Sequence, residues 1–157
     1  MGIKLQRTFR AIAEQPSEPR LNRVLVDFSA SSNSEVRKGF IAANTNNTFI
    51  DVLTSRVPQH ELWKMYRRYR WVVSLPGNGL DCHRTWEAGY MGANVLVQKD
   101  VLPSLHKQKF ITQIDPSIIL NESDLPEVHV NNVSHNELVS HLQAQFVRPI
   151  EAPQARK

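Results

Sequence analysis

Short apolar runs alternate with longer amphipathic segments through the middle of the chain. Val24–Ser29 is β-branched and apolar and leads into a Ser-rich stretch, and Trp71–Leu75 is a short apolar run. Such runs are typical of strands that are buried on both faces of a parallel sheet. Between them, the apolar residues of Pro58–Tyr69 recur at spacings of three and four, which predicts an amphipathic helix. We therefore expect an α/β fold, with a Rossmann-like, open and mostly parallel sheet and helices on both faces.

The remaining patterns complete one Rossmann-like domain over residues 23–147. Residues 1–22 mix basic residues with Pro and Glu and are expected to form a weakly ordered basic lead-in, and residues 148–157 a loose tail. The further expected elements are a helix at Glu35–Ala43, a strand at Phe49–Leu53, a helix at Cys82–Met91 closed by Gly92, a strand at Val95–Gln98, a short helix at Pro103–Lys107, strands at Phe110–Ile114 and Val128–Val130, and a last helix over Leu138–Phe146 behind the capping box Ser134–Glu137.

Composition narrows the class of protein. The 157 residues suffice for one domain with its own core, and the single cysteine excludes an intramolecular disulfide and a cysteine-built zinc site. No apolar run approaches the length of a membrane span, and the first residues, as written, lack the apolar stretch of a signal peptide. Basic residues exceed acidic ones by four (19 against 15), which favours phosphate-bearing partners without identifying one.

The segment from Trp71 to Val97 carries the chemistry, because it reads as strand, glycine loop, helix and strand. Gly77 and Gly79 let backbone N–H groups approach an anion closely, and Asp81 is a natural N-cap for the helix that follows. Arg84 and Glu87 lie one turn apart, so the first could bind phosphate and the second a ribose diol. From spacing alone, an ordinary exposed ion pair between these two residues, contributing about 0.3 kcal/mol, is the favoured alternative.

Beyond spacing, this segment resembles the donor-binding motif of exostosin-type glycosyltransferases. The residues in register with that motif are Ser74, Pro76, Gly77, Asn78, Gly79, Asp81, His83, Arg84, Trp86, Glu87, Ala88 and Gly92. A weaker likeness covers Leu25–Arg37 and Leu125–Leu138, which are similar to the opening and closing elements of the same half of those enzymes.

The resemblance implies the carboxyl-terminal, donor-binding half of a GT-B enzyme, which transfers a glycosyl group from a nucleoside diphosphate sugar to an acceptor hydroxyl of a carbohydrate or glycoprotein. It implies that Arg84 contacts the donor diphosphate and that Glu87 holds the ribose hydroxyls. No metal or other cofactor is implied, and the six histidines are scattered with no D-x-D pattern. The donor-binding residues it implies are Ser74, Gly77, Asn78, Gly79, Asp81, His83, Arg84 and Glu87; it assigns no catalytic residue.

Two departures from the family pattern bear on activity. GT-B enzymes place the acceptor site in an amino-terminal half that this chain lacks, so a separate amino-terminal half is an expected partner. Gly89 stands in the expected helix where the family has Leu, which indicates relaxed constraint. Members of the family usually reside in the secretory pathway behind an amino-terminal anchor, so a Golgi location is expected only if such an anchor precedes this sequence.

Two other hypotheses stay open. The first is a catalytically silent binding or interaction module descended from the donor-binding domain. The second, which we rank lowest, is a nucleic-acid-binding domain, because the run Lys64–Arg70 sets basic residues beside two tyrosines. Tyr66 and Tyr69 belong to the apolar stripe of the expected helix, however, so we favour packing against the sheet for both.

Overall fold

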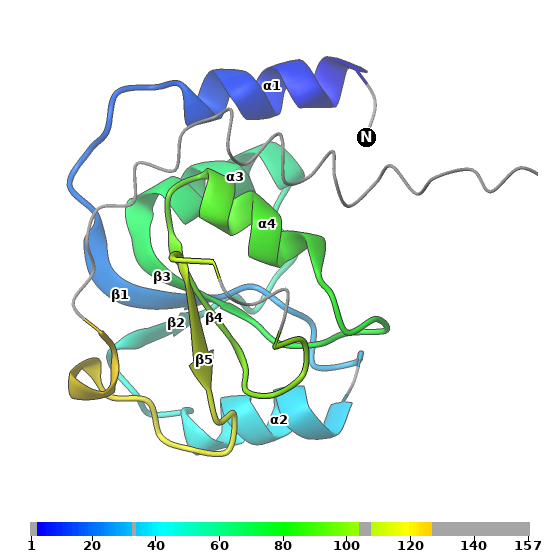
Figure 1. The fold of residues 1–157 in the computed structure, drawn as a ribbon, viewed down its shortest axis with the longest axis vertical. Coiled ribbons are helices and arrows are strands. Elements are labelled where there is room, and N and C mark those ends of the chain that lie inside the picture. The colour runs from blue at the N-terminus through cyan, green and yellow to red at the C-terminus, as the bar shows by residue number, and fades with distance from the viewer. Residues whose placement is uncertain (1–2, 33, 104–107, 127–157) are drawn as a thin grey trace, which may run out of the picture.

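A computed structural model describes residues 3–32, 34–103 and 108–126 of the chain (Figure 1). Its five strands form one open sheet in the order β2-β1-β3-β4-β5, and every neighbouring pair is parallel. This is a Rossmann-like α/β fold, as the sequence predicts. The elements are α1 (Ile3–Ala13), β1 (Leu21–Val26), α2 (Ser34–Ala43), β2 (Ile50–Val52), α3 (Gln59–Arg68), β3 (Tyr69–Ser74), α4 (His83–Tyr90), β4 (Asn94–Gln98), β5 (Ile111–Ile114) and the short 3-10 helix η2 (Glu122–Asp124).

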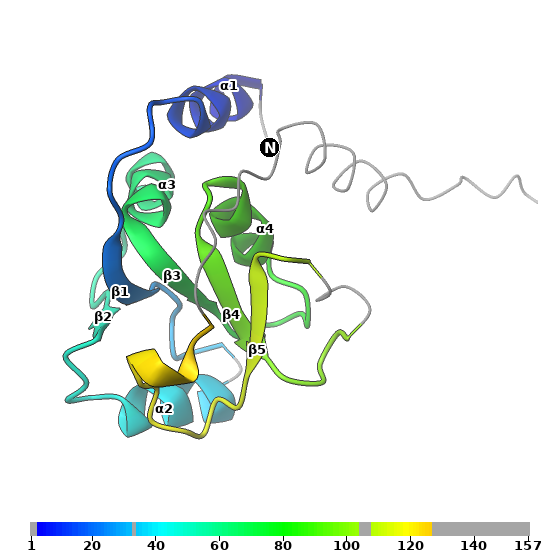
Figure 2. The same cartoon turned by 60° about the vertical axis from the view of Figure 1, so that its left-hand side comes forward.

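Helices cover both faces of the sheet. Figures 1 and 2 show α3 and α4 on one face, with α1 outside them, and α2 on the other. The buried parts of the central strands are mostly apolar because each face of the sheet carries its own core. Leu25, Val72 and Val95 pack with Trp63 and Trp86 on the α3 and α4 side. On the α2 side, the core contains Val24, Val26, Phe28, Phe40, Trp71, Val73 and Leu96.

The helix α1 lies where the sequence indicates a weakly ordered lead-in. Its Phe9 ring contacts Trp63 of α3 and Tyr90 of α4, with ring centres 4.7 Å apart in both pairs, and Ile12 is buried in the same core. Arg67 then fixes the segment behind the helix by donating to the carbonyl oxygens of Ala13, Gln15 and Pro16. A few apolar contacts are thus enough to order this helix, although Lys4, Arg7 and Arg10 make it strongly basic.

The structure explains why two glycines, Gly89 and Gly92, stand at the end of α4. Gly92 closes the helix with φ = 82°, a conformation that favours glycine. Gly89 is not a sign of relaxed constraint, since a Cβ at this position would lie less than 3.0 Å from the Phe110 ring. Because Gly89 has no side chain, Phe110, which directly precedes β5, packs its ring directly on α4.

Several expected elements lie outside the described residues. They are the helix at Pro103–Lys107, most of which is not described, the strand at Val128–Val130, the capping box and helix spanning 134–146, and the tail at 148–157. Over the described part of the chain, no helix combines the length and apolar content that crossing a bilayer requires.

Candidate functional site

The order of the strands creates a topological switch point at one edge of the sheet, and we call the segments that meet there the switch-point region. From β1 the chain crosses over to β2 on one side and then returns to β3 on the other, so the segments that follow β1 and β3 diverge at the same edge. Ligands of open α/β sheets bind at such a point, beyond the carboxyl ends of the strands. Asp27 and Phe28 follow β1 here, and the loop Leu75–Asp81 follows β3 and leads into α4.

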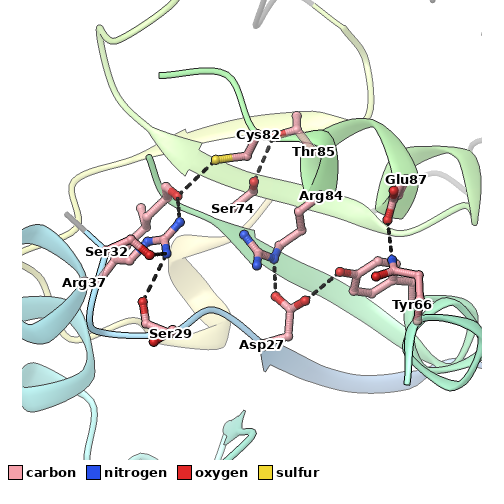
Figure 3. A network of polar contacts seen from close by, with 12 residues as sticks. Asp27, Ser29, Ser32, Arg37, Tyr66, Ser74, Cys82, Arg84, Thr85 and Glu87 are labelled. Atoms are coloured by element: carbon pink, nitrogen blue, oxygen red, sulfur yellow. Dashed lines mark hydrogen bonds and ion pairs between the residues drawn. The ribbon is translucent and has the colours of Figure 1, made fainter. Parts of the chain in front are cut away.

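Arg84, on the first turn of α4, reaches the end of β1 and forms an ion pair with Asp27 (Figure 3). The Arg84 side chain is 18% exposed and that of Asp27 only 1%. Tyr66 of α3 donates its hydroxyl to the second oxygen of Asp27 at 2.6 Å. Burial alone would lower the pKa of Arg84, but the interactions with Asp27, Tyr66 and Cys82 together outweigh burial and the pKa is raised. The guanidinium is therefore firmly charged and held in place.

Glu87 shares this face of α4 but has different partners. Its Oε2 accepts hydrogen bonds from Trp63 Nε1 at 2.9 Å and from Gln59 Nε2 at 2.8 Å. Burial raises the pKa of the Glu87 carboxyl. The alternative of an exposed ion pair between Arg84 and Glu87 is thus wrong, because Arg84 pairs with Asp27 instead and both side chains turn inward toward β1 and α3.

Arg37 of α2 is a component of the site that sequence reasoning missed. It is buried, and it donates to the carbonyl oxygen of Ser29, to Ser32 Oγ and to the carbonyl oxygen of Leu75 at 2.9–3.1 Å. These bonds tie the segment after β1 to the segment after β3. The sequence does carry one signal for Arg37 as a site residue: it is a basic residue that follows a Ser-rich turn at the end of a strand.

Two guanidinium groups consequently share one aromatic ring. Arg37 Cζ lies 5.0 Å and Arg84 Cζ 5.9 Å from the centre of the Phe28 ring. Burial lowers the pKa of Arg37, and the nearby charge of Arg84 lowers it further. Asp27 compensates for one of the two cations, Arg84, whereas Arg37 forms no ion pair with another described residue.

The glycine loop comes close to these groups. A Cβ on Gly77 would lie 2.8 Å from Arg37 Nη2, so glycine at this position lets the loop backbone approach the guanidinium. Asn78, Gly79, Asp81 and His83 are exposed along the loop and the start of α4. Ser74 is buried beneath them, where its hydroxyl bonds that of Thr85 at 2.8 Å.

Asp81 is not the N-cap that the sequence predicts. Cys82 occupies the cap position of α4, and no side chain caps the helix there. The Asp81 carboxylate instead accepts the indole N–H of Trp86 at 2.9 Å, a partner five residues away that competes with the backbone of the first turn. The Asp81 side chain therefore accepts no hydrogen bond from the backbone N–H groups at the start of α4.

The eight predicted donor-binding residues therefore occupy one edge of the sheet, with Ser74 beneath its surface. Among the described residues, no group of three His, Cys, Asp or Glu side chains could hold a metal ion. No protein-family model matches the chain, and no curated protein matches its sequence.

Proposed function

We propose that this chain binds a nucleoside diphosphate sugar at the edge formed by Asp27, the Gly77–Asp81 loop and the start of α4. The observation that carries the proposal is the pair of guanidinium groups, Arg37 and Arg84, gathered on Phe28 at the topological switch point. A diphosphate is the anion best suited to two fixed cations next to a glycine loop and a helix start. The resemblance of residues 74–92 to the exostosin motif points to the same ligand.

In this proposal each residue has a defined task. Asp27 contacts Nε of Arg84, which leaves the two Nη groups of that guanidinium as donors to the diphosphate. Both hydrogen bonds that Glu87 receives end on Oε2, so Oε1 is the acceptor for the ribose hydroxyls. Arg37 holds the two loops together and adds positive charge behind the diphosphate.

The reaction proposed for the complete site is glycosyl transfer. The bond between the anomeric carbon and the β-phosphate oxygen breaks, the acceptor oxygen bonds to that carbon, and the acceptor proton passes to a base. Arg84 and Arg37 stabilise the diphosphate as it leaves with its extra negative charge. No residue of this chain is assigned as the base or as part of the acceptor site.

A second candidate is the catalytically silent module. One observation favours it: the polar side chains at the heart of the motif already have partners within the protein, namely Thr85 for Ser74, Trp86 for Asp81, Asp27 for Arg84, and Trp63 with Gln59 for Glu87. Such contacts would preserve these residues as structural ties even without transfer. The silent module is compatible with nucleotide binding and with its absence. It predicts that no assembly containing this chain transfers a glycosyl group.

Calorimetric titration with UDP and with GDP tests the proposed ligand. We expect the parent chain to bind one of them and Glu87→Ala to weaken that affinity by at least about tenfold, because a hydrogen bond to a charged group contributes about 1.5–3 kcal/mol. Glu61→Ala on α3 is the matched control, since Glu61 is half-exposed and bonds Lys64 instead. Unchanged affinity in Glu87→Ala, with circular dichroism showing a folded protein, would contradict the role of Glu87.

A further inference from the structure

The basic run at the end of α3 is not part of the switch-point region, and its tyrosines are not available for base stacking as a nucleic-acid surface requires. Tyr66 is 1% exposed, and Tyr69 donates its hydroxyl to Asp51 at 2.9 Å. The basic side chains of the run point elsewhere. Lys64, Arg67 and Arg68 meet the segment that connects α1 to β1, which passes along α3 (Figure 2).

These side chains line a cavity of about 350 Å³. It lies at the amino edge of the sheet, because Arg67 and Arg68 end α3 just before β3, and Arg20 directly precedes β1. The switch-point region with Asp27 and Arg84 lies at the opposite, carboxyl edge of the sheet. The cavity is lined by Gln15, Pro16, Ser17, Glu18, Arg20, Lys64, Arg67 and Arg68.

The two inner arginines are hydrogen-bonded but not neutralised. Arg20 donates to the carbonyl oxygens of Tyr66, Tyr69 and Met91 at 2.7–2.9 Å, and Arg67 donates to three carbonyls of residues 13–16. Carbonyl groups satisfy donors and carry no net charge. Neither arginine forms an ion pair with another described residue. Burial and the charge of Arg67 together lower the pKa of Arg20 to about 10, which reflects a cation without a counter-ion.

The charge balance of the cavity is strongly positive. Its lining holds four cations, Arg20, Lys64, Arg67 and Arg68, against the single carboxylate of Glu18. Lys64 is paired with Glu61 outside the lining, at 2.8 Å. Ser17 adds a hydroxyl donor. Two rigid guanidinium groups thus form the inner wall, and Arg68 and Ser17 are left to contact a bound group directly.

We infer that this cavity is a second anion site, which binds a phosphate group carried as inorganic phosphate or as a small phosphomonoester. A phosphate carries about −1.5 to −2 charge at neutral pH and several strong acceptor oxygens, so it offsets this excess charge better than one carboxylate does. The site is separate from the switch-point region at Arg84 and shares no residue with it.

Amide chemical-shift mapping of the ¹⁵N-labelled full chain tests the site at constant ionic strength, with inorganic phosphate and then ribose 5-phosphate as probes. We expect the amides of residues 15–20 and 64–68 to shift together along one saturating curve. Tighter binding of ribose 5-phosphate would assign the site to a phosphomonoester, and equal or weaker binding to free phosphate.

Three variants make the test sharp. Arg68→Gln should weaken the binding of phosphate by about threefold or more, as expected for the loss of one exposed charge. Glu18→Gln should strengthen binding, because it removes the opposing charge. Lys38→Gln on α2 removes the same charge as Arg68→Gln from an exposed position on the other face of the sheet and should change nothing.

Three results would overturn the inference. One is the absence of saturable shifts at residues 15–20 and 64–68, or shifts at 77–84 in their place. Another is an equal loss of affinity in Arg68→Gln and Lys38→Gln, which would indicate unspecific attraction. The last is binding of single-stranded RNA whose affinity rises with length and far exceeds that of phosphate, since that would make these cations part of a nucleic-acid surface.

Discussion

Arg84 at the start of α4 forms an ion pair with Asp27, the first residue after β1, and both charged groups are largely withdrawn from solvent. The pair joins the two segments that diverge at the switch point of the sheet. It therefore serves the fold by locking α4 onto β1, and in the proposed function it also sets the direction in which Arg84 presents its remaining donors.

Asp27→Asn should destabilise the protein by about 3–5 kcal/mol, because it leaves the buried Arg84 cation without its counter-ion. Urea unfolding followed by tryptophan fluorescence measures the loss. Asp51→Asn is the matched control, because it breaks the ion pair between Asp51 and Arg23. The side chains of Arg23 and Asp51 are 39% and 34% exposed, so a much smaller loss of stability is expected. Equal losses in the two variants would refute the structural weight given to the buried pair.

Gly89→Ala should destabilise the protein by about 1–3 kcal/mol even though alanine favours helices, because the new methyl group collides with the Phe110 ring. Gly39→Ala in α2 should do the opposite and stabilise by about 0.5–1 kcal/mol, since the space that its new methyl group would enter is open, with no described neighbour within 4 Å. Thermal unfolding of both variants checks the contrast. A stabilised Gly89→Ala would mean that Phe110 does not pack on α4.

The two carboxyl groups Glu87 and Glu61 should give opposite pH dependences. Burial raises the pKa of Glu87, so the folded state keeps this proton to higher pH than the unfolded chain. Its contribution to stability is complete below the unfolded pKa and is lost as the pH rises through the folded pKa. The free energy of unfolding of the parent should therefore fall with rising pH relative to that of Glu87→Gln.

Glu61 supplies the control for this titration. The hydrogen bond from Lys64 lowers the pKa of Glu61, so its contribution is present above the unfolded pKa and is lost as the pH falls through the folded one. Relative to Glu61→Gln, the parent should gain stability as the pH rises. Urea titrations between about pH 3 and pH 8 cover the ordinary pKa of glutamate. The stability difference between parent and variant should change with pH in opposite directions for Glu87→Gln and Glu61→Gln. A change in the same direction for both variants would contradict the burial of Glu87.

The sequence predicts the sheet well because buried parallel strands leave an unambiguous pattern. Trp71–Leu75 and Val95–Gln98 are mostly apolar runs, and the structure places β3 and β4 there within two residues. The helix α1 was missed because few of its positions contact the core, and its basic residues resemble a solvated lead-in. Propensity along one segment does not reveal that Phe9 will find Trp63.

The candidate site could be predicted only in part for the same reason. Spacing places Arg84 and Glu87 on one face of a helix, which the structure confirms. It does not reveal that their partners are Asp27, Trp63 and Gln59, because these come from elements brought together by the crossovers of the sheet. Asp27 had one local signal, an acid directly after a buried strand. Asp81 was misassigned because a tertiary bond from Trp86 replaces the cap.

The most direct test of nucleotide binding at the switch-point region is calorimetric titration with UDP and GDP of the parent and of the double variant Asp27→Asn with Arg84→Gln. Changing both residues leaves no unpaired buried charge, so the protein should stay folded. The control is Arg23→Gln with Asp51→Asn, which removes the Arg–Asp pair that links β1 to β2. We expect the parent and the control to bind one nucleotide and the double variant to lose at least about tenfold in affinity. No binding by the folded parent, or full affinity in the double variant, would contradict a donor site at Arg84.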